Sequence, residues 1–265
     1  TKKTYWRTCW NGWQSMSKIL ITGGKGKLAT EFRKNYTCDA PAKQELDITN
    51  YHQVRDYLKH HTDIHTIIHA GAMTSVEQCE VDQEQAYRVN IGGTINILQA
   101  IMENSNYESG ARRHFKLVYI STPCIFDGKT GNYDEDSIPN PQNYYGMTKT
   151  ISEELIKNSG IKHVIIRANF VPRETWAYPK AFIDRFGTYL YADQVAEKMA
   201  FHISNSEGIV HIVGKDKLSM FDLAEKLTPK IKPLVMRHYK GKAKLTVDMT
   251  MISKRNYTYS IEDTI

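Results

Sequence analysis

The stretch ILITGGKGKLA, residues 19–29, decides the fold of this chain. Its first four residues are apolar or β-branched, as in a buried strand, and its last residues open a segment with helical spacing. Between them Gly23, Gly26 and Ala29 recur at every third position. Small residues at such a turn let backbone N–H groups approach a pyrophosphate, whose charge the helix N-terminus faces. The pattern therefore predicts a nucleotide-binding turn, although glycines after a strand also occur in plain turns.

Outward from this turn, short apolar runs alternate with helical patterns. Strands are expected at 18–22, 65–71, 115–122 and 163–171. Helical spacing occupies 28–35, 51–61, 85–104 and 146–158. The alternation predicts an α/β fold, a Rossmann-type doubly wound parallel sheet with a small C-terminal substrate lobe. We expect a tail or linker at 1–17, a dinucleotide-binding Rossmann domain at 18–170 and a smaller substrate-binding lobe at 171–265, partly interleaved with the first.

The composition fits a protein with a proper core. Of the 265 residues 41 % are hydrophobic, so wholesale disorder is excluded and one large α/β domain, or a domain with a smaller lobe, is expected. The net charge of +6 comes from scattered basic residues, which is typical of a solvated face, so we expect no nucleic-acid partner. No apolar run approaches the roughly 20 residues that span a bilayer, so we expect no membrane partner.

The four cysteines, Cys9, Cys38, Cys79 and Cys124, show neither CxxC nor metal-ligand spacing. A disulfide framework or a metal site is therefore not expected, and a reducing compartment fits best. Residues 1–17 lack the apolar stretch of a secretory signal, so we expect a cytoplasmic location. A homodimer stays an open alternative to a monomer.

Charged residues occur in CDAPAKQELDIT, residues 38–49, where the second strand of the sheet is expected to end. Dinucleotide-binding domains often carry an acidic residue there to hold the ribose hydroxyls, and Asp39 is the candidate. Lys43 either meets a 2′-phosphate, which favours NADPH over NADH, or is a solvated loop lysine. Asp47 either binds the adenine edge or is a plain turn or cap aspartate before the helix that begins near Asn50.

In NYYGMTKTISEEL, residues 143–155, Tyr145 stands four residues before Lys149. In a helix both side chains lie on one face, about 6 Å apart. An ammonium group at that range favours phenolate, so it lowers the phenol pKa from about 10 towards working pH. Tyr145 would then act as a general acid for a developing alkoxide, and Lys149 would also reach the nicotinamide ribose. The alternative is an ordinary polar surface helix.

Ser121 and Thr122 end the third expected strand. A hydroxyl at the carboxyl end of a parallel strand lies where open α/β sheets bind ligands. Thr122 either hydrogen-bonds and polarises a substrate carbonyl or is merely a β-forming residue. A hydroxyl, a phenol and an ammonium group that follow a nucleotide-binding turn fit hydride transfer to a ketone.

In these segments the chain resembles the extended short-chain dehydrogenase/reductase family, and within it the dTDP-4-dehydrorhamnose reductases. The resemblance runs from about residue 18 to residue 172. It rests on ILITGGKGKLA, QELDITN, IIHAGAMTSVEQCEVDQEQAYRVNIGGTINI, VYISTPCIFDG, NYYGMTK and IIRANFVP, in family order. It implies a Rossmann fold, an NAD(P)H-dependent oxidoreductase and a sugar-nucleotide substrate.

The resemblance also implies roles for individual residues. The catalytic residues would be Thr122, Tyr145 and Lys149. The cofactor would be bound by Gly23, Gly24, Lys25, Gly26, Lys27, Leu28, Asp39, Lys43, Asp47, Ile48, Ala70, Gly71, Ala72 and Asn90, together with Tyr145 and Lys149. Small residues after a strand are also common in packing, and a buried asparagine paired to backbone is the alternative for Asn90. The substrate would contact Thr74, Thr122, Cys124, Phe170 and Arg173.

The chain departs from the family pattern on the substrate side. It reads STPC at 121–124, where relatives usually read Ser-Thr-Asp-Tyr, and Pro123 removes a backbone donor and stiffens the loop. Phe170 stands where relatives often have Trp. Residues 173–186 form a shorter segment than the substrate loop of relatives, and the chain after Leu234 matches little.

The leading hypothesis is a reductase in which NADPH delivers hydride to the 4-keto carbon of a nucleotide-linked deoxysugar, as in dTDP-rhamnose biosynthesis. Arg173 and Lys180 would bind its diphosphate, unless they are ordinary surface charges. A sugar-nucleotide 4,6-dehydratase or 4-epimerase is an alternative, although Pro123 and Cys124 supply no acid–base pair for the dehydratase. A third reading is a non-catalytic nucleotide-binding scaffold or regulatory subunit that resembles the methionine adenosyltransferase beta subunit.

Overall fold

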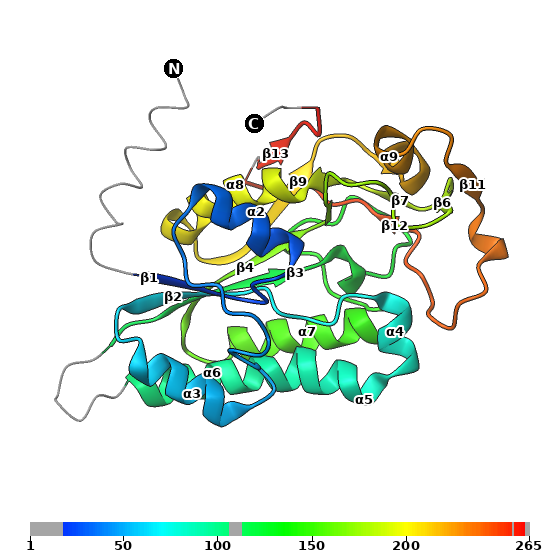
Figure 1. Cartoon of the computed structure of the whole chain (residues 1–265). Helices are drawn as coiled ribbons and strands as arrows, with labels where there is room; N and C mark the ends of the chain where they lie inside the picture. Colours follow the sequence, from blue (N-terminus) through cyan, green and yellow to red (C-terminus); the bar gives the residue numbers. More distant parts are fainter. Residues whose placement is uncertain (1–17, 106–112, 256, 263–265) are drawn as a thin grey trace, which may run out of the picture.

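The structure, a computed structural model, describes residues 18–105, 113–255 and 257–262; the tail expected at 1–17 lies outside the described residues. A central sheet has the strand order β1-β2-β3-β4-β9-β13 (Figure 1). These strands are β1 (Lys18–Thr22), β2 (Ile64–His69), β3 (Lys116–Ser121), β4 (Lys162–Ala168), β9 (Gly208–Gly214) and β13 (Thr258–Tyr259). Every neighbouring pair in the sheet is parallel, so the expected Rossmann-type α/β fold is confirmed.

Helices cover both faces of this sheet (Figure 1). One face carries α3 (Tyr51–His60), α6 (Gly93–Ser105) and α7 (Tyr144–Lys157), and the other carries α2 (Lys27–Asn35) and α8 (Ala192–Asn205). Side chains alternate along β1: Ile19 and Ile21 join the core under α2 and α8, and Leu20 joins the core under α3 and α6. Because both faces are covered, both sets must be apolar, which is why the strands read as continuous apolar runs.

The expected elements are observed, with local differences. Strand β1 has the predicted bounds, and β2 to β4 lie on the other predicted runs. Side-chain caps fix two helix starts, because Asn50 accepts from the backbone N–H of Gln53 and Asn143 from that of Gly146. The helix expected at 85–104 is divided into α5 (Gln83–Ala86), a π-helical segment η1 (Tyr87–Gly92) and α6.

The strand expected to end at 38–49 was predicted wrongly, because the structure has only a single bridge there. Asp39 pairs with Leu20 in parallel, its N–H donates to Ile19 O (2.7 Å), and its carbonyl accepts from Ile21 N (2.7 Å). Pro41 follows two residues later and has no N–H with which to extend a ladder. The chain therefore leaves the sheet edge after one residue.

Short strands after residue 170 form the C-terminal lobe, on the right in Figure 1. The strand pairs are β5 (Phe170–Val171) with β8 (Leu190–Tyr191), and β6 (Lys180–Phe182) with β11 (Lys232–Leu234). A three-stranded sheet joins β10 (Leu218–Ser219), β7 (Phe186–Gly187) and β12 (Asp248–Met249). The lobe also holds α9 (Met220–Leu227) and η3 (Met236–His238). Because α8, β9 and β13 belong to the central layers, the two halves of the chain interleave.

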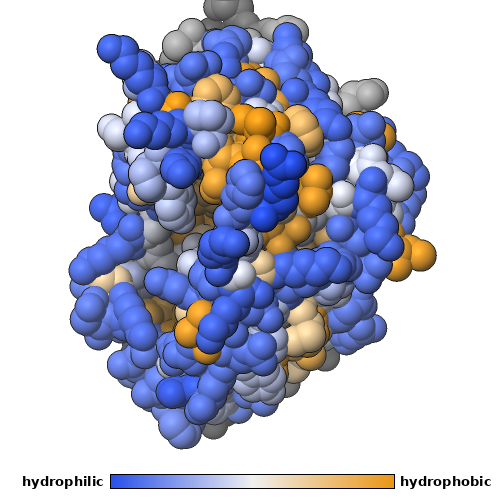
Figure 2. Space-filling model, turned by 90° about the vertical axis from the view of Figure 1, so that its right-hand side faces the viewer, coloured by the Kyte–Doolittle hydropathy of each residue, from blue (hydrophilic) through white to orange (hydrophobic). Residues whose placement is uncertain are grey.

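The C-terminal lobe lies beside α4 (Val76–Val81) and η2 (Pro123–Ile125), which follow the carboxyl ends of β2 and β3. Figure 2 turns this side of the molecule to the viewer, and apolar side chains gather in its upper half among polar ones. Within the part of the chain that the structure describes, no helix has the length and apolar character needed to cross a membrane.

Candidate active site

The glycine turn brings three loops together so closely that side chains are excluded. Gly23 has φ +73°, and a Cβ on it would lie 2.8 Å from Gly71 Cα. A Cβ on Gly24 would lie 2.1 Å from the carbonyl oxygen of Ala40. The turn after β1 is therefore packed against the loops that follow Asp39 and β2, and the glycines permit that approach.

Helix α2 begins directly after the turn, at Lys27, and its N-cap is Gly26. Gly26 has no side chain that can cap the helix, so the first-turn N–H groups face outward beside the positive end of the helix dipole. Leu28 is buried under the helix, whereas Lys25 and Lys27 are exposed. Lys27 Nζ lies 2.6 Å from Oε1 of Glu174, which follows β5 in the C-terminal lobe.

The candidate ribose and adenine residues have partners within the protein. The Asp39 carboxylate accepts from Tyr57 Oη (2.7 Å) and lies 3.5 Å from Lys18 Nζ. Asp47 Oδ1 accepts from the backbone N–H of Thr49 (2.9 Å), which is the turn alternative, because the N-cap of α3 is Asn50. Lys43 Nζ lies 4.0 Å from the Asp47 carboxylate.

The segment that contains Ile48 and the loop after β2 pack together. Ile48 is buried, and its Cδ1 would lie 3.2 Å from a Cβ on Gly71 and 2.8 Å from one on Gly93. Ala70 and Ala72 flank Gly71 and are half-buried. The structure therefore brings the glycine turn, Ile48 and residues 70–72 to one place at the carboxyl edge of the sheet.

A hydrogen-bond chain through His69, which the sequence reading missed, ties these loops to the helical layer. Gly71 N donates to Thr22 Oγ1 (3.1 Å), which lies 2.9 Å from His69 Nδ1. His69 Nε2 lies 3.2 Å from Thr94 Oγ1, which donates to Asn90 O (2.7 Å). Because Thr94 Oγ1 uses its proton on Asn90 O, it accepts from His69, and the imidazole therefore carries its proton on Nε2. Burial, together with the charge of Lys149, lowers the pKa of His69 to about 3, so the ring stays neutral.

Asn90 lies in the π-helical segment and links two elements. Its Oδ1 accepts from Met73 N (2.8 Å), while its Nδ2 donates to Met73 O (3.1 Å) and to Thr148 Oγ1 (2.9 Å). The alternative of a buried asparagine paired to backbone is thus observed. The same bonds hold the loop after β2 against α7, one residue before Lys149.

The three candidate catalytic residues meet at the carboxyl end of β3. Thr122, Tyr145 and Lys149 are all buried, the last two on one face of α7. Burial raises the pKa of Tyr145 above its ordinary value, the nearby Cys124 thiol adds to the rise, and a hydrogen bond with Thr122 opposes it. The expectation that Lys149 lowers this pKa is therefore wrong for the structure described.

The surroundings of Lys149 explain the difference. Its Nζ donates to Ile120 O (2.7 Å) and lies 4.0 Å from the centre of the Tyr119 ring. Burial lowers the pKa of Lys149 to about 7, and Glu153 one helical turn later opposes this. The ammonium group is thus directed at the end of β3, and burial weakens its charge.

Helix α7 packs tightly on the loop after Thr122. A Cβ on Gly146 would lie 2.1 Å from Cys124 O, so the residue after Tyr145 must be glycine for this packing. Thr122 Oγ1 accepts from Cys124 N (3.2 Å), and Cys124 Sγ points to Met249 Sδ of the C-terminal lobe (3.8 Å). The altered loop at Pro123 therefore places a thiol where the lobe meets the catalytic residues.

The remaining substrate candidates are more dispersed. Phe170 is half-buried in β5, and Thr74 is exposed just before α4. Arg173 Nε donates to Asp193 Oδ2 (2.7 Å), and its guanidinium lies 4.0 Å from the centre of the Tyr191 ring. Arg173 thus has a carboxylate partner already.

Helix α7 is also tied to β4 by a buried ion pair that the sequence reading missed. Arg167 Nη2 lies 2.7 Å from Glu153 Oε2, and each side chain is only 1 % exposed. Arg167 Nη1 donates further to Glu135 O and to His211 Nε2, both at 3.4 Å. Arg167 therefore joins the catalytic helix to the loop after η2 and to β9.

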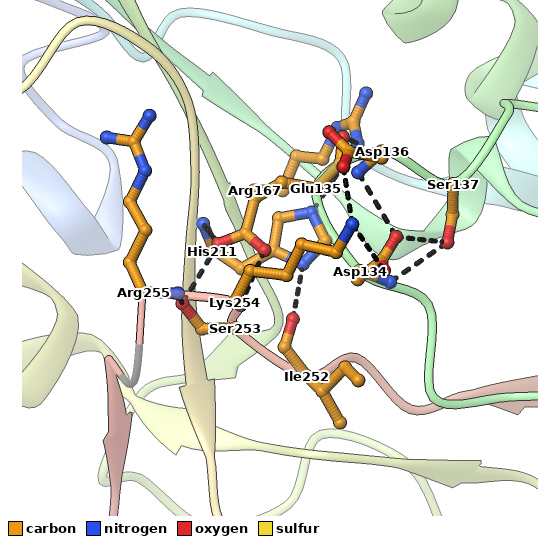
Figure 3. A network of polar contacts seen from close by, with 10 residues as sticks. All are labelled: Asp134, Glu135, Asp136, Ser137, Arg167, His211, Ile252, Ser253, Lys254 and Arg255. Carbon is orange, nitrogen blue, oxygen red and sulfur yellow. Dashed lines mark hydrogen bonds and ion pairs between the residues drawn. The ribbon is translucent and has the colours of Figure 1, made fainter.

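Figure 3 shows how this network continues to the C-terminal segment. Glu135 Oε1 accepts from Ser253 Oγ (2.9 Å), and its Oε2 accepts from Lys254 N (2.9 Å). His211 Nδ1 donates to Ile252 O (2.9 Å), so its Nε2 is free to accept from Arg167. Burial lowers the pKa of His211 to about 4, which keeps it neutral.

A parallel Rossmann-type sheet, a glycine turn after β1 and a Tyr–Lys pair on α7 are the features of NAD(P)H-dependent oxidoreductases of the short-chain dehydrogenase/reductase type. The sequence profile described as "RmlD substrate binding domain" matches residues 16–243, and the chain belongs to that family.

Individual relatives agree with this assignment. The chain is 30 % identical over 231 residues to the spore coat polysaccharide biosynthesis protein SpsK of Bacillus subtilis, which covers 79 % of this chain and 77 % of SpsK. It is 29 % identical over 240 residues to the dTDP-4-dehydrorhamnose reductase of Aggregatibacter actinomycetemcomitans, with the same coverage. The dTDP-4-dehydrorhamnose reductase of Bacillus anthracis, solved in complex with NADP, shares the fold (TM-score 0.79, 24 % identity, 90 % and 91 % of the two chains).

Proposed function

We propose that this protein reduces the 4-keto group of a nucleotide-linked deoxysugar with NADPH, as a dTDP-4-dehydrorhamnose reductase does. The observation that carries the proposal is the meeting of Thr122, Tyr145 and Lys149 at the carboxyl end of β3. Open α/β sheets bind their ligands at this edge.

The residues present fit a dinucleotide. Side chains are excluded from Gly23 and Gly24, and the uncapped N-terminus of α2 offers N–H groups to a pyrophosphate. The turn and residues 70–72 would line its binding site. When bound, the nicotinamide would supply the hydride. Lys43 is exposed, and its Nζ lies 4.0 Å from the Asp47 carboxylate, so it is the residue we assign to a 2′-phosphate.

The chain's own residues would handle the proton. The raised pKa of Tyr145 keeps its phenol protonated at neutral pH, so it is a donor throughout. An alkoxide is a stronger base than a phenolate, and proton transfer to the nascent alcohol is therefore favourable even from a phenol of raised pKa. Thr122 would hold the carbonyl oxygen in line with Tyr145. Lys149, whose Nζ donates to Ile120 O at the end of β3, would hold the nicotinamide ribose rather than lower the phenol pKa.

The test is NADPH consumption with dTDP-4-dehydrorhamnose as the substrate, followed by the change in NADPH absorbance, with NADH as the parallel cofactor. Turnover that depends on the sugar nucleotide supports the proposal, and a preference for NADPH that Lys43→Ala removes supports the role of Lys43. NADPH binding without consumption of any 4-keto sugar nucleotide would contradict the reductase.

A non-catalytic nucleotide-binding subunit is the second candidate. The observation in its favour is the close cover over Tyr145, which packs in one cluster with Cys124 and with Met249 of the C-terminal lobe. Such a subunit would bind NADPH tightly and show no turnover, and Tyr145→Phe would change nothing that can be measured.

A further inference from the structure

Arg185, between β6 and β7, is a buried cation with no carboxylate partner among the described residues. Arg185 is only 8 % exposed. Nε donates to Thr246 O (2.9 Å), while the two terminal nitrogens contact Met220 Sδ (3.4 Å) and Met249 Sδ (3.3 Å). One oxygen and two sulfur atoms are therefore its acceptors.

Such surroundings are costly for a guanidinium group. Thioether sulfur is a weak acceptor, and a charge removed from water is stabilised only when it is paired and fully hydrogen-bonded. By contrast, Arg167 has Glu153 and Arg173 has Asp193 as ion-pair partners. The terminal N–H groups of Arg185, which now contact only sulfur, are therefore available to bind an anion.

Two neighbouring hydroxyl groups, those of Thr246 and Tyr189, are also available as hydrogen-bond donors. The Thr246 hydroxyl is buried and has no hydrogen-bond partner in the described part of the chain, although the Thr246 carbonyl accepts from Arg185. Tyr189 packs in one cluster with Met249, whose sulfur contacts the guanidinium group. Burial raises the pKa of Tyr189 to about 12, so its phenol remains a neutral donor. The Asp248 carboxylate, whose charge also acts on Tyr189, is engaged by Lys217 Nζ at 2.5 Å.

The position of Arg185 connects it to the candidate active site. Met249 Sδ, which contacts the guanidinium, also accepts from Cys124 Sγ (3.8 Å). Cys124 lies two residues after Thr122 and packs in one cluster with Tyr145 and Tyr189. Because methionine side chains are unbranched and adaptable, Met220 and Met249 can move aside for a ligand.

We propose that Arg185, with Thr246 and Tyr189, forms an oxyanion subsite that binds a phosphate or carboxylate group of the sugar-nucleotide substrate. The proposal rests on the proposed function for the identity of the ligand. A guanidinium group binds either oxyanion in a bidentate manner, and the neutral hydroxyl groups complete the donor set.

The experiment compares Arg185→Met with the wild-type protein and with Arg237→Met, which removes an exposed charge from the same lobe. Isothermal titration measures the affinity for dTDP, UDP, UDP-glucose and UDP-glucuronate, each with saturating NADP⁺. Loss of a charge-assisted hydrogen-bond pair is expected to weaken binding about 10- to 100-fold. Arg237→Met should bind like the wild type.

The four ligands distinguish a diphosphate from a sugar carboxylate as the group that Arg185 binds. A weakened affinity of Arg185→Met for dTDP and UDP assigns the subsite to the diphosphate. An unchanged affinity for both nucleotides, with loss of discrimination between UDP-glucuronate and UDP-glucose, assigns it to a sugar carboxylate. An unchanged affinity for every probe overturns the proposal.

Two further readouts keep the result interpretable. Arg185→Met replaces a buried unpaired charge by an apolar side chain, so its melting temperature without ligand should equal or exceed that of the wild type. A large fall in melting temperature, together with an equal loss for every ligand, would show a structural role and overturn the proposal. Because binding is measured without turnover, weakened dTDP binding in a protein that reduces no sugar would reject only the reductase.

Discussion

At the scale of single residues, Tyr145 carries the proposed chemistry. Its phenol is buried, hydrogen-bonds with Thr122 and has a raised pKa, so it is a proton donor rather than a phenolate at neutral pH. Tyr145→Phe removes the proton and leaves the ring in place. We expect turnover to fall about 10²- to 10⁴-fold, the usual worth of general acid catalysis.

The affinity for NADPH should barely change in Tyr145→Phe, since the glycine turn and α2 are untouched. Steady-state kinetics and a fluorescence titration of NADPH check the two halves of this expectation. A variant that keeps full turnover would remove Tyr145 from the proton-transfer step.

Lys149 gives a prediction about pH and stability. Its pKa is lowered from 10.5 to about 7 in the folded protein, so between these values the unfolded chain holds more protons. The free energy of unfolding of the wild-type protein therefore rises as pH increases from 7 towards 10.5. Below pH 7 both states are protonated and the cost of the buried charge is fully present.

We therefore expect Lys149→Met to lose turnover and yet to raise the melting temperature of the ligand-free protein by several degrees at neutral pH. The gain over the wild type should shrink as the pH rises from 7 towards 10.5, because the folded wild-type protein then buries a neutral lysine. Thermal unfolding at a series of pH values measures this. A gain that is independent of pH would mean that the charge of Lys149 is not its cause.

At the scale of elements, the close approach of loops defines the nucleotide-binding edge. Gly24 has no room for a Cβ, which would lie 2.1 Å from Ala40 O, whereas a Cβ on Gly92 would meet its nearest neighbour at 3.7 Å. Gly24→Ala must separate two backbone segments, and overpacking of this kind costs about 1–3 kcal/mol.

We expect Gly24→Ala to unfold at lower urea concentration and to bind NADPH more weakly, because the turn and the loop after Asp39 both move. Gly92→Ala is the matched control and should remain within about 0.5 kcal/mol of the wild type. Equal effects of the two substitutions would show that the packing at Gly24 is not what limits the turn.

At the scale of the whole molecule, the pair Arg167–Glu153 holds α7 on the sheet. Through Glu135 and His211 it also joins α7 to the C-terminal segment at residues 252–253. Arg167→Met leaves the Glu153 carboxylate buried without a partner. Loss of one member of a buried pair costs about 3–5 kcal/mol, whereas replacing both by uncharged side chains is often nearly neutral.

The double variant Arg167→Met/Glu153→Gln should therefore regain most of the stability that Arg167→Met loses. Urea unfolding of both variants measures the coupling, and the exposed pair Lys226–Glu262 is the control, since Lys226→Met should cost less than about 1 kcal/mol. A double variant no more stable than Arg167→Met would show that the two charges are not coupled.

Much of the fold could be predicted from the sequence, because strand and helix periods are local. The run at 18–22 has the bounds of β1, and the helical spacing around Tyr145 and Lys149 is that of α7. The predicted second strand failed for a reason that is also local: Pro41 lacks the N–H that a longer ladder needs. The π-helical segment at Asn90 had no signal in the spacing of apolar residues.

By itself the sequence determined the order of elements, the glycine turn and the placing of Tyr145 and Lys149 on one helix face, since each depends on neighbours within a few residues. Only the tertiary structure decided the charges of these groups. The direction of Lys149 towards Ile120 O, the neutral His69 between Thr22 and Thr94, and the burial of Arg185 against two methionine sulfur atoms depend on contacts between segments far apart in the chain. The physical reason is that burial and pairing set the ionisation of a side chain, and both arise only when distant segments pack together.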